Sequence, residues 1–176
     1  PVQAEGYMFI HCLFVGFKKE FKGKGYASLL LDECMEYSKK EKMNGVCVVS
    51  RNGSFMAKKD IFLKKGFSLV ENMPPDFELL VYKFNDKADD PKFIHNSAEA
   101  YSEGLTIMRS PQCPYSVKNV AAIIDTAKKM NLKPLLLEMD DSKSAQESPC
   151  AFGSFCIINE GKIISHHPIS NKRFEN

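Results

Sequence analysis

The chain has 176 residues, of which 44% are hydrophobic and 26% charged, a composition typical of one ordinary globular domain or two small ones. Its formal net charge is only +2, which excludes the strongly basic surface expected of a nucleic-acid-binding protein. No apolar run reaches the roughly 18 residues that a membrane helix needs, and no secretion signal is visible, so we expect a cytoplasmic protein without membrane or nucleic-acid partners.

The first part of the chain predicts a strand, a basic turn and a helix. Residues 8–15 are apolar and β-rich, which is typical of a strand. Residues 18–25 combine four lysines with two glycines. Apolar residues then recur at helical spacing from Ala27 to Met35, which predicts a helix with one buried face, and Gly45 marks its expected end.

The next part predicts a sheet. Residues 46–49 form a continuous apolar run, typical of a strand buried on both faces. A shorter helix is expected at residues 56–65, followed by strands at 67–70 and 77–84. The strand at 46–49 should pair in parallel with the first strand, because a helix connects the two.

The composition changes after residue 84. Residues 85–102 are rich in polar residues at first and carry Pro91, so we interpret them as a linker between two domains. The domains would then span residues 1–84 and 103–176.

The second domain predicts a compact α/β unit. Strands are expected at residues 105–108 and 135–139, with a helix between them whose apolar stripe covers residues 117–127. Residues 155–158 and 162–165 predict a hairpin. Strand, helix, strand and hairpin together form the skeleton of a small thioredoxin-like domain.

The turn at Gly23 and Gly25 carries the clearest functional signal. A glycine turn at the start of a helix presents several backbone N–H groups to one point, where the helix dipole adds partial positive charge. Four lysines add full charges around it. We therefore expect a phosphorylated cofactor at this turn; the lysines are Lys18, Lys19, Lys22 and Lys24.

The first domain resembles the C-terminal half of a GNAT acyltransferase. The acyl-CoA signature of that family, Gln/Arg-x-x-Gly-x-Gly/Ala, corresponds here to Glu20-Phe21-Lys22-Gly23-Lys24-Gly25. The helix-end signature Tyr-x-x-x-Gly-Phe corresponds to Phe62-Leu63-Lys64-Lys65-Gly66-Phe67. With Gly6-Tyr7-Met8-Phe9-Ile10 and Gln112-Cys113-Pro114, nearly the whole chain is similar to GNAT proteins that carry a C-terminal YoaP-type domain.

This resemblance implies an acetyl-CoA-dependent N-acetyltransferase that acts on a small-molecule or peptide amine without a metal. The strand end near Phe14 and Val15 would pair with the pantetheine arm of acetyl-CoA. Backbone amides would hold the pyrophosphate, and the residues that supply them are Phe21, Lys22, Gly23, Lys24, Gly25 and Tyr26.

Two residues depart from the family pattern. The family's proton-donating tyrosine corresponds to Phe62, which has no hydroxyl, and Glu20 stands where Gln or Arg is usual. The catalytic residue is therefore unknown, with His11 and Cys113 as candidates. A non-catalytic module that binds CoA or another protein is the alternative function.

The resemblance also implies that the family's N-terminal strands and helices are absent from this chain. A lone half-sheet exposes an unpaired edge. We expect a second copy of the chain or the missing N-terminal segment to cover that edge.

Cys113 opens a second motif, Cys113-Pro114-Tyr115-Ser116, which resembles the Cys-Pro-Tyr-Cys motif of glutaredoxins with its second cysteine replaced. A helix N-terminus stabilises a thiolate, so monothiol redox chemistry is a second alternative, beside a purely structural role. His166 and His167 have no acidic or cysteine residue at ligand spacing, which predicts exposed surface residues. The six cysteines show neither a C-x-x-C pair nor zinc spacing, which predicts reduced thiols and no metal site: Cys12, Cys34, Cys47, Cys113, Cys150 and Cys156.

Overall fold

The structure is a computed structural model that describes residues 1–175 of the chain. It contains two compact units, each with a four-stranded mixed sheet, so the expected α/β class is confirmed. Val2–Phe93 forms one unit, and Pro1 with the chain from Ile94 onward forms the other.

The sheet of the unit Val2–Phe93 has the strand order β2-β3-β5-β4. Its strands are β2 (Tyr7–Ile10), β3 (Gly45–Arg51), β4 (Ser68–Met73) and β5 (Phe77–Lys83). Strands β2 and β3 pair in parallel, which confirms the expected pairing, and the other two pairs are antiparallel. Every residue of β3 is buried, as its unbroken apolar run predicted.

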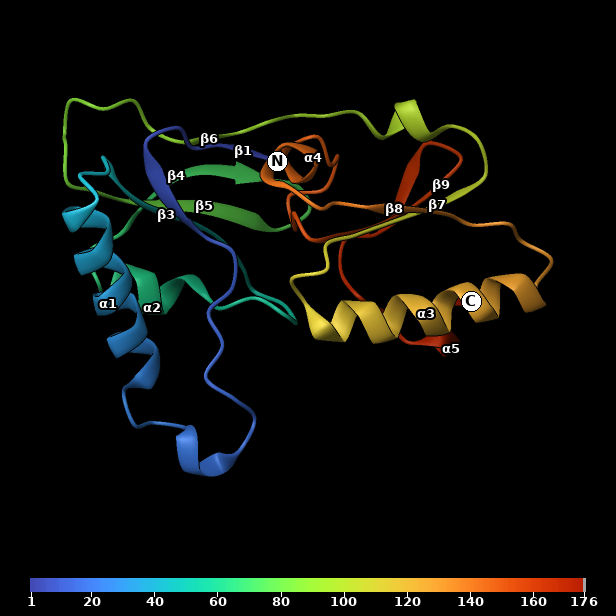
Figure 1. Cartoon of the computed structure of the whole chain (residues 1–176), viewed down its shortest axis with the longest axis horizontal. Helices are drawn as coiled ribbons and strands as arrows, with labels where there is room; N and C mark the ends of the chain where they lie inside the picture. The colour runs from blue at the N-terminus through green and yellow to red at the C-terminus, as the bar shows by residue number, and fades with distance from the viewer. Residues whose placement is uncertain (176) are drawn as a thin grey trace. The chain divides into compact units, whose positions relative to one another are not determined.

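Helices α1 (Tyr26–Lys40) and α2 (Lys59–Leu63) share one core with this sheet. Leu31 of α1 and Phe62 of α2 pack together with Val46, Val48 and Leu80 of the strands. Both helices therefore cover the same face of the sheet, as the ribbon also shows (Figure 1).

Three predicted boundaries in this unit were wrong. The first strand ends at Ile10, because residues 11–18 leave the sheet and lead to the short 3-10 helix η1 (Lys19–Phe21). Helix α1 ends at Lys40, before a left-handed turn at Lys42 with φ +56°, and Gly45 already belongs to β3. Helix α2 is only five residues long.

The segment predicted as a linker also contains ordered structure. Strand β6 (Lys92–Phe93) pairs antiparallel with β1 (Val2–Gln3), and the 3-10 helix η2 (Ala98–Tyr101) follows. Two-residue strands carry too little pattern to be predicted locally, because their pairing partner lies far away in the sequence.

The second unit has the strand order β10-β9-β7-β8. Its strands are β7 (Leu105–Arg109), β8 (Leu135–Glu138), β9 (Phe155–Asn159) and β10 (Lys162–Ser165). Strands β7 and β8 are parallel, whereas β9 pairs antiparallel with both β7 and β10. The predicted hairpin is confirmed.

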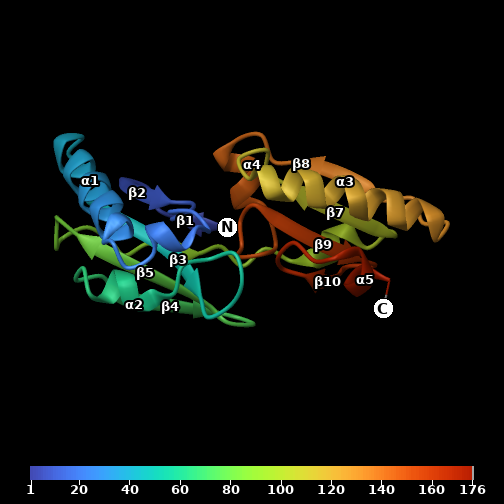
Figure 2. The same ribbon diagram turned by 90° about the horizontal axis from the view of Figure 1, so that it is seen from below.

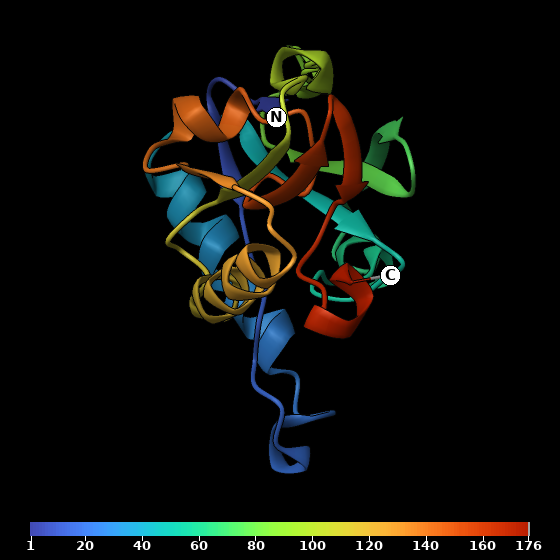
Figure 3. The ribbon, with the colours of Figure 1, turned by 90° about the vertical axis from the view of Figure 1, so that its right-hand side faces the viewer.

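Helix α3 (Pro114–Lys129) packs on this sheet through Val120, Ile123 and Ala127 (Figure 2). The short helix α5 (Asn171–Phe174) lies beside α3 on the same face (Figure 3). Helix α4 (Ser142–Gln146) begins with a capping box between Asp141 and Ser144. Neither α4 nor α5 was predicted.

No helix within residues 1–175 combines the length and the apolar character needed to cross a membrane. The six cysteines form no disulfide: Cys47, Cys150 and Cys156 are buried, Cys34 and Cys113 are half-buried, and Cys12 is exposed.

Candidate acyl-CoA site

The turn at Gly23 and Gly25 leads from the segment after β2 into helix α1, and it extends beyond the N-terminal end of that helix (Figure 1). Both glycines adopt left-handed backbone angles, with φ of +70° at Gly23 and +78° at Gly25. A Cβ at either position would meet no atom within 4 Å, so the backbone angle and not packing requires glycine. The turn therefore faces open space, where a ligand can approach its backbone closely.

The backbone N–H groups of this turn fall into two sets. Those of Phe21 and Lys22 donate to carbonyl oxygens three residues earlier, at 3.1 Å each. The N–H groups from Gly23 to Ser28 have no acceptor among residues 1–175, and no side chain caps α1, whose N-cap is Gly25. Phosphate contacts are thus expected from Gly23 to Ser28, since the amides of Phe21 and Lys22 are already used.

A cavity of about 380 Å³ lies beside the turn. Six of the eight residues predicted to bind the cofactor line it: Val15, Phe21, Lys22, Gly23, Gly25 and Tyr26. Phe14 and Lys24 are not among its lining residues. Gly16, Ala27, Ser28 and Ile61 were missed; Ile61 comes from α2, so no local pattern connects it to the turn.

Two exposed aromatic residues, Phe21 and Tyr26, line the cavity, and Phe14 and Phe17 lie in the segment that leads to the turn. The rings of Phe14 and Phe17 meet edge to face, 4.9 Å apart, and those of Phe21 and Tyr26 are 6.4 Å apart. Gly16 has φ +117°, and a Cβ there would approach the Phe21 ring to 3.0 Å. The four rings offer flat apolar surfaces on which a planar ligand group can stack.

The charge around the turn is positive. All four lysines of the cluster are exposed, and Lys18 Nζ lies 3.5 Å from Glu20 Oε1. That ion pair is solvent-exposed on both sides, so it contributes at most about 1 kcal/mol and is screened by salt. Glu20 offsets one lysine and leaves the cluster attractive to an anion.

Strand β3 extends beyond its partner β2. The last parallel pair joins Ile10 and Val48, whereas β3 continues to Arg51 and stays paired with β5 on its other side. In the described part of the chain, residues 49–51 have no strand partner on the β2 side. An extended ligand arm can add there as a strand.

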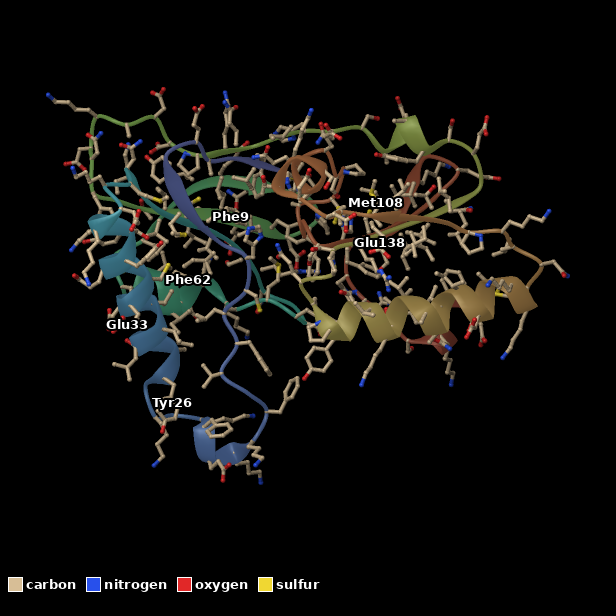
Figure 4. All side chains as sticks on the ribbon, in the orientation of Figure 1. Phe9, Tyr26, Glu33, Phe62, Met108 and Glu138 are labelled. Atoms are coloured by element: carbon tan, nitrogen blue, oxygen red, sulfur yellow. The ribbon has the colours of Figure 1, made fainter. Side chains whose placement is uncertain are left out.

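Phe62 occupies the position of the family's tyrosine, and it lies in the core. Its side chain is fully buried between α2 and the sheet, with its ring 5.6 Å from that of Phe67. Figure 4 shows Phe62 well separated from Tyr26, which marks the turn end of α1. The hydroxyl of Tyr7, another tyrosine of this unit, already donates a hydrogen bond to the carbonyl oxygen of Asp89 at 2.8 Å.

His11 directly follows β2. Its ring meets that of Phe9 edge to face at 4.8 Å, and desolvation lowers its pKa below the ordinary value of histidine. A lowered pKa keeps the imidazole neutral at pH 7, the form that can accept a proton. His11 is not among the residues that line the cavity at the turn.

A larger hollow of about 720 Å³ lies at the β4–β5 hairpin and the start of α2. Its lining mixes Lys58 and Lys59 with Asp60, Asp76 and Glu78, so it favours no single ligand charge. No group of three or more histidine, cysteine or acidic side chains within residues 1–175 is placed to hold a metal ion.

Comparison with known proteins points to one kind of relative. Residues 135–176 match the family model described as YoaP-like. The chain is also 27% identical over 179 residues to the protein named uncharacterized N-acetyltransferase YoaP of Bacillus subtilis (strain 168). That alignment covers 99% of this chain and 70% of the relative's length.

Cys113, the other catalytic candidate, is the N-cap residue of α3 and is half-buried. Pro114 is the first helical residue, and the buried Ser116 hydroxyl donates to the carbonyl oxygen of Cys113 at 2.9 Å. Ser116 therefore acts as a local hydrogen-bond donor at the helix start.

The expectation for His166 was wrong. Instead of being exposed, His166 and its neighbour His167 are half-buried, and His166 Nδ1 lies 3.1 Å from Cys150 Sγ. The two residues are 16 positions apart and come together only because the β9–β10 hairpin folds the chain back.

Proposed function

We propose that this chain carries the acyl-CoA site of an N-acyltransferase, which transfers an acetyl group from acetyl-CoA to an amine. The observation that carries the proposal is the turn at Gly23 and Gly25, with its left-handed angles, uncapped N–H groups and adjoining cavity. The similarity to a protein named as an N-acetyltransferase supports the same reaction.

In this proposal the pyrophosphate of acetyl-CoA accepts hydrogen bonds from the N–H groups between Gly23 and Ser28. The exposed lysines add electrostatic attraction, and the pantetheine arm extends toward the unpaired edge of β3 at residues 49–51. This arm would thus pair with β3, since Phe14 and Val15 lie in the irregular segment after β2.

The reaction needs positioning more than a dedicated catalytic side chain. The amine nitrogen attacks the thioester carbonyl, the C–S bond breaks, and the amine loses a proton as CoA leaves as the thiol. Holding both reactants in line supplies most of the rate enhancement. His11 is the candidate base, because its lowered pKa keeps it neutral near pH 7.

The proposal also covers the fold family of each unit, the partner of the sheet edge and the cellular location. Sheet order β2-β3-β5-β4 with α1 after β2 supports a GNAT half, and the sheet with α3 supports a thioredoxin-like second unit. A second copy, or chain outside these residues, would cover the edge strand β2. A cytoplasmic location, where thiols stay reduced, is part of the same proposal.

Isothermal titration of the chain with acetyl-CoA, CoA and desulfo-CoA tests the binding site directly. Saturable binding of all three, weakened by salt, is the expected result, because the contacts involve the pyrophosphate and not the sulfur. No binding at millimolar acetyl-CoA would refute the proposal.

A CoA-binding module without turnover is the second candidate, and the buried Phe62 favours it. Release of free CoA thiol in the presence of a panel of amines separates the two functions. Amine-dependent thiol release identifies a transferase, whereas tight CoA binding without release identifies a binding module.

A further inference from the structure

The interior of the second unit holds two cysteines and a histidine in contact. Cys150 lies in the loop before β9, Cys156 is the second residue of β9, and His166 follows β10. Both cysteine side chains are fully buried. All three residues fall within the segment 135–176, which matches the YoaP-like family model.

The Cys150 sulfur is surrounded by hydrogen-bonding groups. His166 Nδ1 lies 3.1 Å from it, and as a thiol it donates to the carbonyl oxygen of His166 at 3.6 Å. Hydrogen bonds from the Cys156 thiol and the backbone N–H of Phe152 favour its ionised form. The N–H of Cys150 donates to the Ser148 hydroxyl at 3.2 Å, which fixes the loop that carries the sulfur.

These contacts divide the roles of the two thiols. Burial alone would raise the pKa of Cys150, but the hydrogen bonds from Cys156 and His166 and the charge of His166 outweigh it and lower the pKa to about 6. Because the Cys156 thiol donates to Cys150 in a buried site, the pKa of Cys156 is raised. Cys150 is thus the thiol that ionises first, and Cys156 is the one that stays protonated.

We propose that Cys150 and Cys156 form a peroxide-sensitive dithiol site, in which Cys150 reacts with the peroxide and Cys156 completes a disulfide. The Cys150 sulfur attacks one peroxide oxygen, the O–O bond breaks, and a sulfenic acid and water form. The Cys156 sulfur then attacks that sulfenic sulfur, the S–O bond breaks, and a second water leaves. Two thiols and one hydrogen peroxide give one disulfide and two waters.

Because the site is buried, only a small oxidant can reach it. A disulfide such as oxidised glutathione is too large to reach a fully buried sulfur, whereas hydrogen peroxide is close to water in size. Cys12 and Cys113 have more exposed surface, but Cys150 and Cys156 are joined to each other by a hydrogen bond. Small peroxides should therefore produce one specific intramolecular disulfide.

The test treats the reduced full chain with hydrogen peroxide and maps its peptides by mass spectrometry. We expect a Cys150–Cys156 linkage before Cys12 or Cys113 is oxidised, and no mixed disulfide at Cys150 with oxidised glutathione. In Cys156→Ala, Cys150 should accumulate as a sulfenic acid, which a 1,3-diketone traps once the oxidised chain is unfolded in its presence. Oxidation of Cys12 and Cys113 while Cys150 and Cys156 stay reduced would overturn the proposal.

His166→Gln isolates the role of the histidine without disturbing either cysteine. The oxidation rate of the natural chain should rise with pH through about 6 and level off above 7, whereas the variant should keep rising to higher pH, because the hydrogen bond and charge of His166 no longer offset the burial of Cys150. Cys156 and the backbone N–H of Phe152 also form hydrogen bonds with Cys150, and only His166 changes in the variant.

At pH 6 the thiolate fraction, and with it the oxidation rate, should fall in His166→Gln by up to about tenfold for each unit by which the pKa of Cys150 rises. An unchanged rate and pH profile would show that His166 does not activate Cys150, and would refute that part of the site.

Discussion

Substitution of Gly25 by alanine gives the sharpest test of the phosphate turn. Gly25 has φ +78°, and its Cβ position meets no atom within 4 Å, so alanine adds strain without a clash. An alanine with left-handed backbone angles costs about 1–2 kcal/mol. We expect the chain to relieve this strain by rotating φ, which turns the neighbouring N–H groups away from the phosphate. Loss of one N–H bond to a charged phosphate costs about 1.5–3 kcal/mol. Acetyl-CoA affinity should therefore fall about 10- to 150-fold.

Gly104→Ala is the matched control. Gly104 has φ +63° and also has nothing within 4 Å of a Cβ, but it belongs to the second unit. Both variants should lose similar thermal stability, measured by calorimetry, while titration with acetyl-CoA should show weaker binding only for Gly25→Ala. Equal affinity in the two variants, with both folded, would refute the assignment of the turn.

Three further predictions concern the unit Val2–Phe93. Phe62→Tyr should lower the free energy of unfolding by about 1–3 kcal/mol, because the hydroxyl would be buried without a partner; higher turnover at unchanged stability would contradict this. Asp76→Ala removes the carboxylate that pairs with Arg51, whose side chain is 11% exposed. The free energy of unfolding, measured by urea titration, should fall by about 3 kcal/mol. In the control Glu20→Ala, which removes an exposed carboxylate, the free energy of unfolding should fall by less than about 1 kcal/mol. Lys24→Glu should weaken acetyl-CoA binding at low salt and much less at 0.5 M salt, and an equal effect at both would count against an electrostatic role.

The sequence was most informative where a pattern is local. The unbroken apolar run at β3 and the hairpin of β9 and β10 were predicted, because burial and a tight turn leave their marks on adjacent residues. The first strand was predicted too long for a physical reason. Phe14 and Val15 are apolar, but they lie in an irregular segment after β2 and not in the sheet, and Val15 lines the cavity.

Some functional residues likewise carry a local sequence signal, and others do not. The glycines of the turn carry a local signal, since only their backbone angles require glycine. Ile61 and the pair of Cys150 and His166 have no local signal, because α2 and the β9–β10 hairpin bring them into place. The cap at Asp141 was a usable sign of α4 that sequence reasoning missed.

The pairing of β1 with β6 has a mechanical consequence. Val2 pairs with Phe93 and Gln3 with Lys92, so the unit's two ends leave from the same end of a short antiparallel ladder. A pulling force applied at these ends would open the ladder one residue pair at a time, like a zipper, and would not shear several hydrogen bonds at once. The same closeness of its ends would let this unit be circularly permuted, or inserted into a loop of another protein, with little stretching of the chain.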